Sequence, residues 1–129
     1  MCGIAGIIAT QPLTPELRSC VLRMNDRETH RGPDGEGVFH DGPVALAMRR
    51  LSIIDVKGGH QPLFNEDKSV ALVANGEIYN AVELRALLRS QGHQFRTGSD
   101  CEVLVHLYEQ YDLECVQHMR GMFAFALWD

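Results

Sequence analysis

The feature that most constrains the fold is an alternation of short β-rich runs with turn-forming clusters from Val38 to Asn75. The runs are VFH, VALAM, LSIID and VALVA, and the clusters between them are Asp41-Gly42-Pro43, Lys57-Gly58-Gly59 and Asn65-Glu66-Asp67. β-Branched and aromatic residues favour strands, whereas Gly, Asn and Asp favour the turns that separate them. The pattern therefore predicts a sheet over this block.

Two further strands are predicted outside the block. GIAGIIA, residues 3–9, is a short apolar run bounded by polar residues and proline, which is typical of a buried strand. The last eight residues, MFAFALWD, are also strand-like, with no turn and no partner strand after them. Because natural domains normally cover an apolar sheet edge, we expect the chain to be part of a longer protein, truncated at its C-terminus.

Three helices are predicted from their caps. Thr14 precedes Pro15 at the start of the first, and the second and third start with the capping patterns Asn80-x-x-Glu83 and Ser99-x-x-Glu102. Gly92 is the expected stop of the second helix. Each helix has an apolar face at helical spacing. The face of the first is Leu17, Cys20, Val21 and Met24, that of the second Leu84, Leu87 and Leu88, and that of the third Val103, Leu104, Leu107, Tyr108 and Tyr111.

Composition narrows the class of protein. With 129 residues, 45% of them hydrophobic, the chain fits one domain with a real core. It has 12 Lys and Arg against 17 Asp and Glu, a formal charge of −5, and no basic run, so a nucleic-acid partner is not expected. The apolar start lacks a basic segment and is too short to span a bilayer, so no membrane association and a cytoplasmic location are expected.

The cysteines and histidines show no metal or disulfide pattern. Cys2, Cys20, Cys101 and Cys115 are widely spaced without a CxxC pair, and the six histidines are scattered. We expect reduced thiols and no metal site, with Cys20 and Cys115 as core residues.

Cys2 has an unusual position, directly after the initiator methionine. Removal of Met1 would leave a free α-amine, with a reference pKa of about 7.7 to 8.0, beside a thiol with a reference pKa of about 8.5. Nucleophile and base would then lie in one residue. A cysteine here can equally be a small buried apolar residue at the start of a strand.

Seven stretches, in order, carry a family resemblance. They are MCGIAG, HRGPDGEG, RRLSIID, GGHQPL, NGEIYN, GSDCEV and GMFAFALWD. Together they resemble the glutaminase domain of class II glutamine amidotransferases, and most closely that of glutamine-hydrolysing asparagine synthetases. The resemblance implies an α+β fold, the N-terminal-nucleophile hydrolase sandwich of two antiparallel sheets flanked by helices. Residues 1–129 would form one glutaminase domain that is incomplete, because the family continues into further strands, and the synthetase domain would be absent.

The resemblance also implies roles for six residues. Cys2 would be the nucleophile, and the Asn75 side chain with the Gly76 backbone N–H would form the oxyanion hole. Arg50 and Asp100 would pair with the α-carboxylate and α-ammonium of glutamine. Glu77 would line the glutamine pocket. These six residues make up the predicted site.

Each role has a simpler alternative. Asn75-Gly76 can be an ordinary turn, although the Glu-Ile-Tyr-Asn that follows is not a second alternating strand. A single Arg, Asp or Glu is commonly a solvated surface charge, and Arg49 is easily confused with Arg50. His30 of HRGPD has no proton to transfer when an α-amine is available, so an architectural role is predicted for it.

By the resemblance, Cys2 attacks the glutamine carboxamide, ammonia leaves a γ-glutamyl thioester, and water releases glutamate. In asparagine synthetases the ammonia reaches a second domain that activates aspartate with ATP and Mg²⁺; the glutaminase domain itself needs no cofactor. One alternative is the glutaminase domain of an amidotransferase with a sugar-phosphate or phosphoribosyl acceptor. Another is a non-catalytic glutamine-binding or assembly module that keeps Met1. The sequence leaves the acceptor open, and a homodimer is compatible with it.

Overall fold

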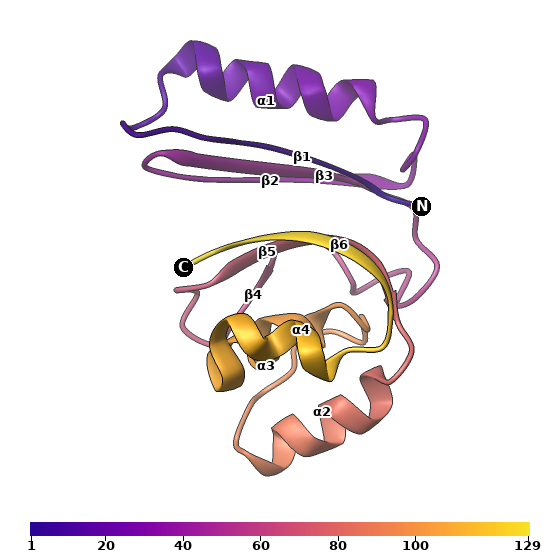
Figure 1. Ribbon diagram of the computed structural model, residues 1–129. Coiled ribbons are helices and arrows are strands. Elements are labelled where there is room, and N and C mark those ends of the chain that lie inside the picture. Colours follow the sequence, from indigo (N-terminus) through magenta and orange to yellow (C-terminus); the bar gives the residue numbers. More distant parts are fainter.

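The computed structural model describes all residues, 1–129, as two facing antiparallel sheets with helices on their outer sides (Figure 1). The first sheet has the strand order β1-β3-β2 and the second β4-β5-β6. The elements are β1 (Gly3–Ile8), α1 (Pro15–Arg27), β2 (Gly35–Asp41), β3 (Val44–Arg50), β4 (Leu63–Phe64), β5 (Ala71–Ile78), α2 (Ala81–Ser90), α3 (Glu102–Tyr111), a 3₁₀ turn (Asp112–Glu114), α4 (Cys115–His118) and β6 (Gly121–Trp128).

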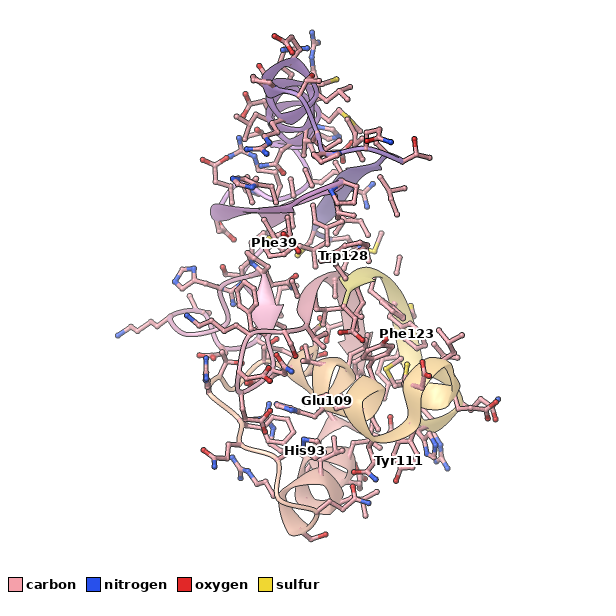
Figure 2. The ribbon with its side chains drawn as sticks, turned by 90° about the vertical axis from the view of Figure 1, so that its left-hand side faces the viewer. Phe39, His93, Glu109, Tyr111, Phe123 and Trp128 are labelled. Carbon is pink, nitrogen blue, oxygen red and sulfur yellow. The ribbon has the colours of Figure 1, made fainter.

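The central strand of the first sheet, β3, divides its side chains between two layers. Val44, Leu46 and Met48 pack between the sheets with Val73 of β5, where Figure 2 also places Phe39 and Trp128. The small residues of the other face, Ala45 and Ala47, pack against Val21 of α1. This alternation is the period-two pattern of a strand covered on both faces.

The second sheet carries the larger core. Fifteen buried residues form one cluster between this sheet and the helices α2 to α4. β5 contributes Leu72, Ala74 and Ile78 to it, and α3 contributes the fully buried Leu104 and Leu107. Because Leu72, Ala74 and Ile78 all face the helices, Val73, Asn75 and Glu77 face the opposite way, toward the first sheet.

The helix starts were only partly predicted. Thr14 caps α1, its Oγ1 accepting from Leu17 N at 3.4 Å, and Gly92 has the positive φ of +105° expected after α2. Asn80 does precede α2, but its side chain accepts from Arg120 N and donates to His118 O instead of capping the helix.

The third helix and the face of the first differ from prediction. Glu102 does not complete a capping box with Ser99, because its carboxylate accepts from the N–H groups of Arg96 and Thr97. In α1 the buried residues are Val21 and Asn25, whereas Leu17 and Met24 are 39% and 38% exposed. Cys115 is buried as expected, but Cys20 is only half-buried.

Two predicted strands also need correction. LSIID, residues 51–55, is a loop and not a strand, because the Arg50 guanidinium gathers the carbonyls of residues 54–56 and Asp55 takes a positive φ of 48°. GIAGIIA forms β1, but as an edge strand that pairs only with β3 and leaves Ile8 75% exposed.

The strand predicted from MFAFALWD is confirmed as β6, which pairs with β5 from Gly121 to Trp128. β6 is an edge strand of the second sheet, with β4 at the opposite edge. An apolar groove lies between β6 and β1. None of the helices is long and apolar enough to cross a membrane. The predicted α+β sandwich of antiparallel sheets is thus confirmed.

Candidate active site

All six predicted site residues line one pocket, of about 210 Å³, where β1 begins and β3 ends. They come from four separate segments of the chain: the N-terminus, the end of β3, the second half of β5 and the loop before α3. The lining predicted from sequence comprises Cys2, Arg50, Asn75, Gly76, Glu77 and Asp100. The fold therefore brings together the whole set.

Cys2 directly precedes β1 and is only partly buried. The backbone N–H of Leu51 donates to its Sγ at 3.3 Å, and Arg31 Nε donates to its carbonyl at 3.2 Å. The thiol in turn donates to the Leu51 carbonyl oxygen at 3.7 Å, so both backbone groups of Leu51 hold the sulfur in place. Met1 also lines the pocket and is 73% exposed, so it lies at the pocket mouth.

The two adjacent arginines at the end of β3 point to opposite faces of the first sheet. Arg50 is buried and lines the pocket, where its guanidinium donates to the carbonyls of Ile54, Asp55 and Val56 at 2.7 to 3.2 Å. Gly59 makes room for it, because a Cβ there would lie 2.6 Å from Arg50 Nη2. Arg49 instead pairs with Asp26 and Glu36 outside the pocket.

The charges inside the pocket are not paired with one another. Arg50 and Asp100 each lack a salt-bridge partner within 4.0 Å, although both line the same cavity. One oxygen of Asp100 accepts from Ile78 N at 2.7 Å, which fixes the carboxylate at the end of β5. A buried cation and an anchored anion held apart in this way suit a ligand that carries both charges.

Asn75 and Glu77 share the β5 face that looks toward the first sheet and Cys2. Between them, Gly76 touches β6 so closely that a Cβ would lie 2.9 Å from the Cβ of Phe123. Gly76 therefore lets the neighbouring strand approach. An amide side chain and a glycine backbone therefore line the same pocket as the Cys2 thiol.

Sequence reasoning missed Gln61, another residue of the pocket. Its side-chain amide accepts from Ala74 N at 2.7 Å and donates to Ala74 O at 2.9 Å. It thereby takes the place of a backbone partner for Ala74 beyond the two-residue strand β4, at the residue just before Asn75. The GGHQPL motif contained this signal, but the role depends on a contact across 13 residues.

A second cysteine also lines the pocket. Cys101 is buried, with its Sγ 3.7 Å from the Gly76 carbonyl oxygen. Burial, reinforced by the nearby Asp100 carboxylate, raises the pKa of the Cys101 thiol far above its ordinary value. It therefore stays protonated and is a poor nucleophile. Cys2, by contrast, is only partly buried.

The HRGPD segment supports the pocket from behind. Asp34 accepts from Ser52 N at 2.8 Å and its own N–H donates to Arg50 O at 2.9 Å. A Cβ at Gly32 would overlap the carbonyl group of Arg49. His30 is exposed, bonds the Arg27 carbonyl and does not line the pocket, which agrees with an architectural role for the segment.

Comparisons with known proteins show which proteins this chain is similar to in sequence. Asparagine synthetase [glutamine-hydrolyzing] of Triphysaria versicolor is 50% identical over 129 residues, which cover 100% of this chain and 22% of that protein. Asparagine synthetase [glutamine-hydrolyzing] 1 of Bacillus subtilis (strain 168) is 47% identical over 131 residues, which cover 100% of this chain and 21% of that protein. The chain thus spans about a fifth of the relatives' length.

A solved structure shares the fold. Glutamine phosphoribosylpyrophosphate amidotransferase from B. subtilis, complexed with ADP and GMP, superposes with a TM-score of 0.77 at 22% identity, covering 99% of this chain and 35% of that one. The glutamine amidotransferase domain family, by its sequence model, matches residues 1–129. With that match over its whole length, the chain belongs to the glutamine amidotransferase domain family.

Proposed function

We propose that this domain hydrolyses glutamine to glutamate and ammonia through a thioester on Cys2. The observation that carries the proposal is the pocket itself, which unites a partly exposed thiol with a buried arginine and an anchored aspartate that have no salt-bridge partner. Free glutamine is a zwitterion with a carboxamide at its other end. Arg50 would bind its α-carboxylate and Asp100 its α-ammonium, with Glu77 completing the lining.

The chemistry then follows from the placement of Cys2. Its α-amine takes the thiol proton, and the thiolate attacks the carboxamide carbon. The developing oxyanion is bound by the Asn75 side chain and the Gly76 N–H, donors worth about 3 kcal/mol each. The protonated amine returns its proton to the departing nitrogen, ammonia leaves, and water cleaves the γ-glutamyl thioester to glutamate and free thiol.

This mechanism requires removal of Met1. With Met1 attached, the nitrogen of Cys2 is an amide and cannot act as a base. Met1 is 73% exposed and lines the pocket, so it is accessible to a peptidase and would obstruct the pocket if it stayed. A chain that keeps Met1 would be the non-catalytic glutamine-binding module, the alternative from a different class.

We further propose that the full-length protein uses the ammonia to make asparagine from aspartate, with ATP and Mg²⁺ bound by a separate synthetase domain. The support is the identity of 47–50% to asparagine synthetases along the whole chain. The test is to supply the full-length protein with glutamine, ATP, Mg²⁺ and aspartate and to measure asparagine. Amination of a sugar phosphate or a phosphoribosyl acceptor instead would support the alternative amidotransferase.

The glutaminase step is tested by comparing Cys2→Ala with Cys20→Ala, which removes a thiol on α1 outside the pocket. Loss of the nucleophile should lower glutamate release by about a thousandfold or more, while Cys20→Ala should leave it unchanged. Glutamate release that persisted in Cys2→Ala would contradict the mechanism.

A further inference from the structure

Four side chains converge behind the second sheet, away from the pocket. Glu66 lies in the turn after β4, His93 in the loop after α2, and His106 and Glu109 one turn apart on α3. One potential ligand atom from each lies within 4.8 Å of the others. Figure 2 shows His93 and Glu109 side by side on the helical side of the molecule. None of the four lines the glutamine pocket.

The spacing of these atoms matches a metal coordination shell. His106 Nδ1 lies 3.0 Å from an oxygen of Glu109 and 3.6 Å from one of Glu66; His93 Nδ1 lies 3.4 and 3.7 Å from oxygens of the same two carboxylates. Ligands bound to a tetrahedral zinc at about 2.0 to 2.1 Å are about 3.3 Å from one another. The observed distances bracket that value, so an ion could enter with small side-chain movements.

The ligand types and charges select among metals. Two neutral imidazoles and two carboxylates carry the two negative charges that balance a divalent cation, and imidazole nitrogen favours zinc over magnesium or calcium, which take oxygen ligands. No lysine or arginine forms a salt bridge with the carboxylate of Glu66 or Glu109, whose only salt-bridge partners are the two histidines. Arg96 donates to the backbone carbonyl of Glu66 at 2.6 Å and not to its carboxylate. The dication would therefore meet no competing fixed cation on these carboxylates.

Neighbouring groups already orient the carboxylates. Asn65 Nδ2 donates to Glu109 Oε1 at 2.9 Å, and Gln94 N donates to Glu66 Oε1 at 2.8 Å. Such outer hydrogen bonds are the usual support of metal ligands.

We propose that Glu66, His93, His106 and Glu109 bind one zinc ion. The ion would tie the β4–β5 turn and the α2–α3 loop to α3, the helix preceded directly by Asp100 and Cys101 of the pocket. The sequence shows no metal spacing because the ligands lie on three segments that only the tertiary fold brings together. The proposal is independent of glutamine hydrolysis.

The test uses two of the three ligands that are not fully buried, His93 and Glu66. His93→Asn and Glu66→Gln each remove one ligand with little change in volume, and both side chains are partly exposed, whereas His106 is fully buried and its loss would disturb the core. His40→Asn is the matched control, because His40 is an exposed histidine of β2 outside the cluster. Circular dichroism without metal should show the same fold in all four proteins.

Zinc titration by calorimetry should give one site in the wild-type protein and in His40→Asn. The affinity of this site for zinc should fall at least about tenfold in His93→Asn and in Glu66→Gln. Zinc should raise the Tm of the wild-type protein and of His40→Asn, and not that of His93→Asn or Glu66→Gln. Co²⁺ should give the strong visible absorption of a tetrahedral site only in the wild-type protein and in His40→Asn. No zinc binding by the wild-type protein at micromolar metal, or equal binding by the cluster variants, as expected for zinc on Cys2, would overturn the proposal.

Discussion

At the scale of single residues, the pocket depends on which way neighbouring side chains point. Arg49 and Arg50 are consecutive on β3, so the pleat sends them to opposite faces. Arg50 faces the space between the sheets, with its guanidinium on the loop carbonyls and the pocket, while Arg49 faces the acidic residues near α1. A one-residue slip of this strand would exchange them and empty the site of its cation.

Substitution of each arginine by lysine tests this assignment. Lysine keeps the charge but loses the planar fork that serves both the loop and a carboxylate. Arg50→Lys should lower kcat/KM for glutamine by about 10- to 100-fold, as expected for loss of a charged hydrogen bond. Steady-state kinetics should show nearly unchanged values for Arg49→Lys. Equal effects of the two substitutions would contradict the assignment.

The site residues that lie in sequence motifs were predictable from the sequence. Residues that act through a backbone group, or through a contact with a distant part of the chain, were missed. Cys2, Asn75 and Asp100 lie in recognisable motifs and all line the pocket. The Leu51 N–H that contacts the Cys2 sulfur has no side-chain signature, because a backbone donor is visible only in the folded chain. Gln61 was missed because its partner, Ala74, belongs to another strand.

At the scale of elements, the loop after β3 is held by its surroundings and not by its own propensity. LSIID has the composition of a strand, but Arg50 binds its carbonyls and Asp55 accepts from Gly98 N at 2.7 Å. Tertiary contacts thus override local preference. The exposed face of α1 was missed for a similar reason, because Val21 is the one apolar residue of this helix that is buried against the alanines of β3, where Leu13 fills the rest of the space.

The HRGPD segment behind this loop gives a prediction about stability. A methyl group at Gly32 would overlap the Arg49 backbone, whereas one at Gly35, three residues on, would meet only the Arg50 Cβ at 3.9 Å. Gly32→Ala should therefore destabilise the fold by about 3 kcal/mol, and Gly35→Ala by less than about 1 kcal/mol. Urea unfolding of both variants measures the difference. Equal stabilities would show that the segment does not pack as described.

At the scale of the whole molecule, the two halves of the sandwich are unequally buried. Fifteen buried residues join the second sheet to its helices, but only four join α1 to the first sheet. The layer order was predictable because strands, helices and a closing strand follow one another in the sequence. Which strands are edges was not, since β1 reads as a buried run and lies at an edge.

Hydrogen exchange should report this asymmetry. Amides of β5 and α3 should exchange only at the free energy of global unfolding, because both elements lie in the larger core. Amides of α1, which buries only Val21 and Asn25, should exchange at a lower free energy. Mass spectrometry of peptides from these three elements makes the comparison. Protection of α1 equal to that of β5 would contradict the expected order.

The role of Cys2 as the nucleophile is tested by the intact mass of the protein before and after treatment with a glutamine-like alkylating agent, with the adduct located by peptide mapping. If Cys2 is the nucleophile, we expect a chain without Met1 that carries one adduct on Cys2 and none on Cys101, whose buried thiol stays protonated in the same pocket. A chain that retains Met1 and is unmodified, or an adduct on Cys101 instead, would contradict it.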